Sequence, residues 1–254
     1  MSIHVEKDGP VTIVTIDRPE VRNAVDPATA AALRAAFDDF EADDSALVAV
    51  LTGAGGHFCA GYDLKAFAAQ GVDYDPAGEG PMGPTRRLLS KPVLAAVEGY
   101  AVAGGLELAL WCDLRIAAEG AIFGVFCRRW GVPLIDGGTV RLPRIVGQGR
   151  ALDMILTGRP VDAAEGLAMG LANKIVPDGE ARTAAANMAQ LIASFPQLCM
   201  NVDRTSACAA FDADLPSALR AEAVAGEAPV LEGAREGAAR FAAGVTLRGT
   251  FDNI

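Results

Sequence analysis

The stretch AVAGGLELALWCD, residues 101–113, joins two glycines to an apolar run that holds a single carboxylate. The pattern predicts a short buried helix that begins at about Gly104. The glycines at 104 and 105 either let a ligand approach the helix start, since no Cβ intervenes, or permit close packing of the helix on a strand. Glu107 lies three residues after Gly104, so both residues belong to one face of this helix.

The segments on either side alternate between strand and helix patterns. Continuous apolar runs at 46–52, 92–99 and 114–120 are typical of strands that are buried on both faces. Residues 3–16 form an alternating pattern around a turn, and residues 26–43 show helical periodicity after an Asp-Pro start. This order predicts an α/β fold with a largely parallel sheet. Beyond about residue 180 only helical patterns follow.

Composition excludes several classes of protein. The chain has 254 residues, 51% of them hydrophobic, and a net charge of −10, which disfavours nucleic acids and anionic membranes as partners. Its N-terminus has no basic-then-apolar signal pattern. Five cysteines without a C-x-x-C pair, and only two histidines, predict neither a disulfide framework nor a metal site. A reducing cytoplasm is the expected location.

Two expected strand ends lead into glycine-rich turns, at 50–64 and 95–110. The first contains Gly-Ala-Gly at 53–55, but it lacks the third glycine and the position in the chain of a dinucleotide fingerprint. Helices that begin at about Gly61 and Gly104 would leave backbone N–H groups without intrahelical partners. Two such ends aimed at one point would form an oxyanion hole, with the N–H groups of Ala60 and Gly104 as donors.

Glu107 is the candidate acid of this site. A carboxylate among leucines and a tryptophan is partly desolvated, which raises its pKa toward values useful for general acid/base catalysis. The alternative is an acid on the solvated edge of an amphipathic helix.

The motifs together resemble a known family. HFCAGYDL at 57–64, followed by KPVLAAVEGYAVAGGLELALWCDLRIAAEGAIFG at 91–124, is similar to the crotonase, or enoyl-CoA hydratase/isomerase, superfamily. The resemblance implies a spiral of ββα units over residues 1–195. It also implies a C-terminal helical region at 196–254 that packs on the core and on neighbouring subunits, in homotrimers or dimers of trimers. The substrate would be an acyl-CoA thioester, with coenzyme A part of the substrate and no further cofactor.

The resemblance also assigns roles to individual residues. The thioester oxygen would lie between the N–H groups of Ala60 and Gly104. Coenzyme A and the substrate channel would contact Arg22, Ala24, Phe58, Gly61, Tyr62, Asp63, Leu64, Tyr100 and Val102.

One position departs from the family pattern. Glu107 matches the first of two glutamates that hold water in family hydratases, but the second position carries Cys127. Cys127 is either a nucleophile or, as we favour, an apolar thiol in the pocket wall. Asp136 either replaces the missing acid or caps a helix that begins at Gly137. His57 is expected to be a loop residue.

These residues leave several reactions open. Family weight favours syn hydration of a 2-enoyl-CoA, with Glu107 as acid/base and Asp136 as its helper. A single carboxylate also suffices for double-bond isomerisation, and another lyase reaction or hydrolysis of an acyl-CoA comes third. A protein of a different class, which binds acyl-CoA with little turnover, is the remaining alternative.

Overall fold

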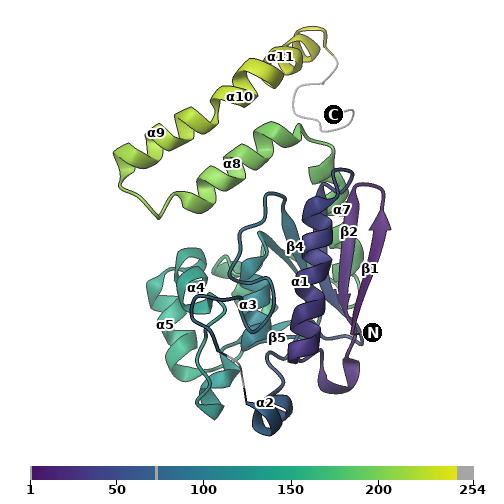
Figure 1. Cartoon of the computed structure of the whole chain (residues 1–254), viewed down its shortest axis with the longest axis vertical. Helices are drawn as coiled ribbons and strands as arrows, with labels where there is room; N and C mark the ends of the chain where they lie inside the picture. Colours follow the sequence, from purple (N-terminus) through teal and green to yellow (C-terminus); the bar gives the residue numbers. More distant parts are fainter. Residues whose placement is uncertain (1, 72–73, 245–254) are drawn as a thin grey trace. The chain divides into compact units, whose positions relative to one another are not determined.

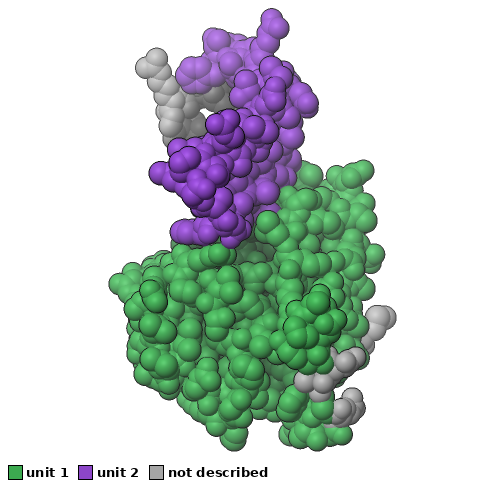
Figure 2. Space-filling model, turned by 60° about the vertical axis from the view of Figure 1, so that its left-hand side comes forward, with its two compact units in different colours: residues 1–189 green, residues 190–254 purple. Residues whose placement is uncertain are grey.

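The computed structural model describes residues 2–71 and 74–244. The chain divides into two compact units, Met1–Ala189 and Gln190–Ile254, which are coloured separately in Figure 2. The expected boundary lay at 195/196. The observed boundary falls inside the helix α7 (Ala181–Ala193), so the second unit begins six residues earlier than expected.

A six-stranded sheet forms the centre of the first unit, in the order β1-β2-β3-β4-β6-β9. Figure 1 labels three of its strands, β1, β2 and β4. The first two strands make the expected antiparallel hairpin, and all other pairs are parallel. The strands β3 and β4 are buried along most of their length, as continuous apolar runs predict. The strands of this sheet are β1 (Ile3–Asp8), β2 (Val11–Ile16), β3 (Val48–Gly53), β4 (Val93–Val97), β6 (Leu114–Ala118) and β9 (Lys174–Val176).

A smaller sheet, β5-β7-β8, adjoins the loops that follow β3 and β4. The strands β5 and β7 are parallel, and β8 is antiparallel to β7. An isolated bridge between Cys59 and Ala101 links the loop after β3 to β5. The two glycine-rich turns are therefore neighbours in space. The bounds are β5 (Tyr100–Val102), β7 (Ile122–Gly124) and β8 (Val161–Asp162).

Helices flank the two sheets. The first, α1 (Pro27–Ala42), begins as predicted: the Asp26 carboxylate accepts a hydrogen bond from Thr29 N at 2.8 Å. Its apolar face buries Leu33, Phe37 and Phe40. The other helices of this unit are α2 (Leu64–Gln70), α3 (Gly104–Trp111), α4 (Gly138–Val146), α5 (Gln148–Thr157), α6 (Ala163–Ala168) and α7, with 3₁₀ turns η1 (Pro19–Val21) and η2 (Phe126–Trp130).

The helix α3 is buried at every residue, including Glu107. At its C-terminal end lies the buried guanidinium of Arg115, which donates to Cys112 O at 2.9 Å and to Ala109 O at 3.4 Å. Arg115 Nε also donates to Leu171 O. These carbonyls replace the water that the charge loses on burial.

The second unit is helical, as the sequence predicts. It contains the end of α7, then α8 (Gln197–Ala209), α9 (Leu215–Ala225), α10 (Glu227–Pro229), the π-helical turn η3 (Val230–Ala234) and α11 (Arg235–Ala242). Large apolar side chains are exposed on these elements and on the turn between α8 and α9. They are Leu198, Phe211, Leu215, Leu219, Val224, Val230, Leu231 and Phe241.

Candidate active site

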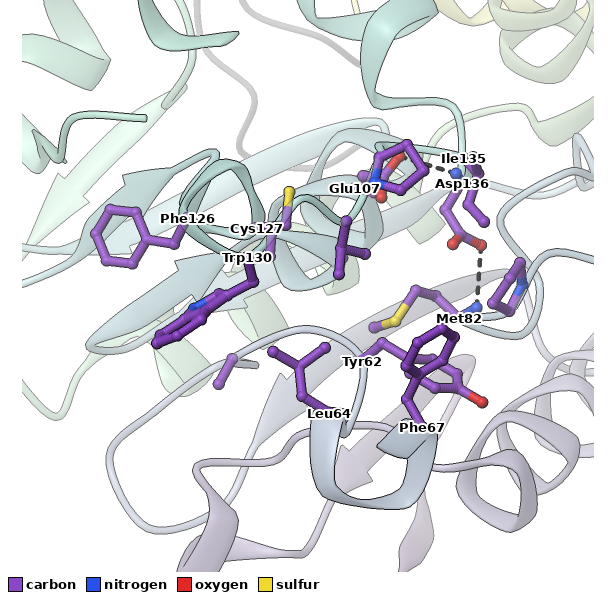
Figure 3. Close-up of a pocket in the computed structure, with 16 residues that line it drawn as sticks. Tyr62, Leu64, Phe67, Met82, Glu107, Phe126, Cys127, Trp130, Ile135 and Asp136 are labelled. Atoms are coloured by element: carbon purple, nitrogen blue, oxygen red, sulfur yellow. Dashed lines mark hydrogen bonds between the residues drawn. The ribbon is translucent and has the colours of Figure 1, made fainter. Parts of the chain in front are cut away.

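A cavity of about 140 Å³ opens where the two glycine-rich turns meet (Figure 3). The carboxylates of Glu107 and Asp136 lie toward one end of it, and Phe126 and Trp130 lie toward the other. Its wall consists of Ala60, Tyr62, Leu64, Phe67, Pro81, Met82, Ala103, Gly104, Glu107, Phe126, Cys127, Trp130, Val132, Pro133, Ile135 and Asp136. Among the described residues that form this wall, only Glu107 and Asp136 carry acidic or basic side chains.

Glu107 lies in the first turn of α3 and is 2% exposed. Its Oε1 accepts hydrogen bonds from the backbone N–H groups of Asp136 and Gly138, both at 2.8 Å. Burial raises the pKa of Glu107 to about 7, with a further contribution from the Asp136 charge. The carboxyl is thus near half-protonated at neutral pH, as a general acid requires. The alternative of a solvated surface acid is wrong.

Asp136 is also 2% exposed. Its Oδ1 accepts hydrogen bonds from Met82 N at 3.0 Å and from the Thr85 hydroxyl. It does not cap α4, because that helix begins after Gly137 without a side-chain cap. Burial raises the pKa of Asp136, and the two hydrogen bonds act in the opposite direction. Figure 3 shows its carboxylate in the same cavity as Glu107.

The two glycines at the start of α3 have different roles: one permits close packing and the other borders the cavity. A Cβ at Gly105 would lie 2.1 Å from Cys59 O, so this glycine permits close packing on the neighbouring loop. Gly104 instead lines the cavity, where a Cβ would meet the Met82 sulfur at 2.6 Å. The preceding Ala103 has φ 54°, a strained conformation for a non-glycine residue, at the sharp turn into the helix.

The structure contradicts the assignment of Ala60 as a donor. Its N–H donates to Arg22 O at 3.0 Å, so it is not available to a ligand. The helix α2 begins at Leu64 rather than at Gly61, and the Asp63 carboxylate caps it by accepting from Lys65 N and Ala66 N. The segment before α2 is extended, which the glycine-rich pattern did not reveal.

Tyr62, rather than Ala60, has a backbone N–H group that is available to a ligand in the cavity. A parallel bridge joins Tyr62 to Val25: Val25 N donates to Gly61 O and Asp63 N donates to Val25 O, both at 2.8 Å. Successive N–H groups of an extended chain point in opposite directions, so Tyr62 N points away from Val25. Within residues 2–71 and 74–244, no protein acceptor takes this N–H or that of Gly104.

Glycine at 61 brings the two N–H groups to the same place. It has φ 101°, and a Cβ there would lie 2.9 Å from Ala103 Cβ and 3.0 Å from Gly104 N. Only glycine allows the loop to lie this close to the start of α3. Two unpaired donors thus border the cavity that contains Glu107.

Comparisons with known proteins match this architecture. A sequence profile of the enoyl-CoA hydratase/isomerase family matches residues 6–248. The chain belongs to this family. It is 42% identical over 197 residues to enoyl-CoA hydratase EchA19 of Mycobacterium tuberculosis, covering 75% of this chain and 74% of the relative. It is 40% identical over 201 residues to carnitinyl-CoA dehydratase of Salmonella typhi, covering 77% and 76%.

Solved structures confirm the crotonase fold of this hydratase/isomerase family member. The crystal structure of an enoyl-CoA hydratase from M. tuberculosis H37Rv matches with a TM-score of 0.89 and 36% identity, over 95% of this chain and 96% of that one. An enoyl-CoA hydratase from Bacillus anthracis matches with a TM-score of 0.87 and 31% identity, over 96% and 97%.

The substrate residues that the resemblance implied are only partly in the cavity of this family member. Tyr62, Leu64 and Cys127 line it. The other seven do not. Phe58 is fully buried in the core, Val102 is 5% exposed outside the wall, and Tyr100 stacks on His57 with ring centroids 5.2 Å apart.

Near the loop before α1, Arg22 lies over the Tyr100 ring at 5.3 Å, and Ala24 is 8% exposed. Neither Arg22 nor Ala24 lines the cavity, and Gly61 and Asp63 shape the loop rather than the wall. Whether these residues contact coenzyme A stays a prediction. His57 is a loop residue, and its Nδ1 faces Tyr100 N at 3.4 Å.

Cys127 is a pocket-wall thiol in η2, 6% exposed. Burial raises its pKa, as does the neighbouring Glu107 charge, so the thiol stays protonated at neutral pH. This favours the apolar interpretation over the nucleophile.

Sequence reasoning missed much of the apolar wall. Phe67 lies three residues after Leu64 on α2, so helical spacing alone could have identified it. Met82 falls in the Gly/Pro-rich segment 70–83, which has no helical or strand pattern; it is 1% exposed, and its N–H donates to Asp136. Residues 72–73 of that segment lie outside the described part of the chain. Thr85 gave no sequence signal, because its partner is 51 residues away.

Proposed function

We propose that this enzyme catalyses reversible syn hydration of a 2-enoyl-CoA, with Glu107 and Asp136 as its pair of acids. The observation that carries the proposal is the position of Asp136: its carboxylate faces the Glu107 cavity and caps no helix. Asp136 thus supplies, from a different segment of the chain, the second acid that is absent at position 127. Names of hydratase and dehydratase relatives support the same reaction type.

The thioester oxygen would accept hydrogen bonds from Tyr62 N and Gly104 N. Negative charge develops on this oxygen as the enolate forms, and two fixed donors stabilise it. Gly104 N adds the positive end of the α3 dipole. Ala60, which we expected as a donor, is replaced in this proposal by the residue two positions later.

Each of the two carboxyl groups carries out one proton transfer. The Asp136 carboxylate, whose Oδ1 accepts two hydrogen bonds that favour its ionised form, accepts a proton from the water that attacks the β-carbon. The protonated Glu107 gives its proton to the α-carbon, and the two additions on one face complete the hydration. Exchange with solvent then returns both carboxyls to their starting states. No cofactor is needed in this scheme, since coenzyme A is part of the substrate.

A crotonyl-CoA assay tests the proposal directly. Loss of the conjugated-thioester absorbance, with 3-hydroxybutyryl-CoA as product, is the expected result. A panel of 2-enoyl-CoA thioesters with longer chains covers the case in which the acyl pocket rejects four carbons. No turnover of any member would overturn hydration.

Isomerisation is the second candidate, and the thiol at position 127 favours it, because a carboxylate is absent there. One acid can remove a proton from carbon 2 and return it to carbon 4. A 3-enoyl-CoA in the same assay would then gain conjugated-thioester absorbance.

We further propose a homotrimer, or a dimer of trimers, in the cytoplasm. The exposed apolar side chains of α8 to α11 support assembly, since such surfaces rarely stay in water. The thiols of Cys199 and Cys208 are exposed, which a reducing compartment tolerates. Within the described residues, none of the helices combines the length and hydrophobicity needed to cross a bilayer.

A further inference from the structure

Asp136 is held by a segment that lies far from it in the sequence. Met82 N and the Thr85 hydroxyl both donate to Oδ1 of Asp136, and Thr85 is fully buried. Both donors act on one oxygen of the carboxylate. Within residues 2–71 and 74–244 no protein donor reaches Oδ2, which leaves that oxygen for water or substrate. We call residues 80–85 the clamp segment.

The shape of the clamp segment fits this task. A Cβ at Gly80 would lie 2.2 Å from Thr85 Oγ1 and 2.3 Å from Asp136 Oδ1, so glycine is required for the hydroxyl to reach the carboxylate. Arg141 fixes both partners from α4, donating to Thr85 O at 2.7 Å and to Asp136 O at 3.1 Å. The hydroxyl and its acceptor are therefore positioned by the same guanidinium.

Several charged or titratable groups face Asp136. Glu107 approaches from α3, Arg141 from α4, Arg86 from the chain after Thr85, and Tyr62 from the loop before α2. Glu107 favours the protonated form of Asp136, and the arginines favour the ionised form. The Thr85 hydroxyl donates a hydrogen bond to the carboxylate, which favours the ionised form. A hydrogen bond to a charged group is among the stronger ones in proteins.

We propose that Thr85 is a positioning residue, which fixes the Asp136 carboxylate through Oδ1 so that Oδ2 faces the reacting water. This rests on the proposed function, in which Asp136 is the second acid of the hydratase. Thr85 touches neither substrate nor water in this scheme and acts only through Asp136.

The variants Thr85→Val and Thr85→Ser test the proposal, with Thr52→Val as the matched control. Thr52 is buried and donates to Ala96 O at 3.2 Å, so the control loses one hydrogen bond remote from the site. For Thr85→Val we expect a fall in kcat of about tenfold at pH 7 and an acidic limb of the kcat profile displaced to higher pH. The sign follows because Asp136, once deprived of the donor, ionises only at higher pH. KM should change little, Thr85→Ser should restore the profile, and Thr52→Val should leave it unchanged.

The double variant Thr85→Val/Asp136→Asn makes the test specific. If Thr85 acts only through Asp136, adding Thr85→Val to Asp136→Asn has no further effect on kcat. Additive losses would overturn the positioning role, as would a Thr85→Val profile identical to that of Thr52→Val.

Two further outcomes are distinguishable. If Asp136→Asn keeps full hydratase activity, the proposed function fails whatever Thr85 does. If Asp136→Asn is inactive while Thr85→Val is normal, only the positioning role fails. Should Thr85→Val not fold, Gly80→Ala displaces the same hydroxyl, and Gly149→Ala, whose Cβ meets nothing within 4 Å, is its control. Normal activity and an unchanged pH profile of Gly80→Ala would then overturn the proposal.

Discussion

At Glu107, burial and hydrogen bonding act in opposite directions on one carboxyl group. Two backbone N–H groups at 2.8 Å favour the charged form, and removal from water disfavours it. Burial prevails, and the pKa rises to about 7. The hydrogen bonds therefore serve mainly to fix the direction of Oε1, while the environment sets when the group carries its proton.

Replacement of Glu107 by glutamine should remove catalysis and preserve the fold. The amide oxygen can still accept from Asp136 N and Gly138 N, but the side chain cannot donate an acidic proton. We expect a loss of kcat of about 10²–10⁴-fold with crotonyl-CoA. The same measurement on Glu119→Gln, an exposed acid, controls for the loss of one charge. Unchanged kcat would show that another group transfers the proton.

The raised pKa of Glu107 also predicts a dependence of stability on pH. In the unfolded chain the group ionises near 4.5, whereas in the fold it stays protonated to about 7. The folded state therefore binds more protons between these values, so the free energy of unfolding falls as pH rises through this window. Glu107→Gln lacks this loss and should gain roughly 3 kcal/mol over the native chain by pH 8 relative to pH 4. Urea titrations at both pH values measure it, and a gain independent of pH would contradict the assignment.

At the scale of elements, the start of α3 forms part of the cavity wall. Gly104→Ala would place a methyl group 2.6 Å from the Met82 sulfur, in the cavity wall next to the N–H group proposed as an oxyanion donor. Met82 is a flexible side chain, so the fold should adapt. We expect kcat/KM to fall by roughly 10²-fold, as when one oxyanion donor is lost, with only a small drop in thermal midpoint. Equal losses in Gly149→Ala would mean that the effect is not specific to this site.

Much of this could be predicted from the sequence, for local reasons. The hairpin, α1 and the buried strands follow from periodicity, and the Gly104–Glu107 pair follows from helical spacing. The prediction of Ala60 as a donor was wrong because the extended bridge between Tyr62 and Val25, which are 37 residues apart, decides which N–H group points into the cavity. The role of Asp136 was open for the same reason, since its partners are Met82 and Thr85. Contacts that are distant in the sequence leave no periodic pattern.

At the scale of the whole molecule, the helical second unit exposes large apolar side chains that a monomer would leave in water. Leu215 is 71% exposed and Leu231 is 73% exposed. We expect sedimentation equilibrium to give three or six times the chain mass of 26.2 kDa. Replacement of Leu215 and Leu231 by aspartate should shift the population toward smaller species. A native chain that sediments as a monomer at micromolar concentration would contradict the proposed assembly.

The buried guanidinium of Arg115 bears on the electric field in the cavity. A short helix carries opposite partial charges at its two ends, and their fields partly cancel at any point nearby. Arg115 contacts the carbonyls of Ala109 and Cys112 at the negative end of α3. Its positive charge offsets that end and leaves the positive end at Gly104 less opposed. Arg115, at the opposite end of the helix from Gly104, thus strengthens the positive potential that an enolate oxygen would experience.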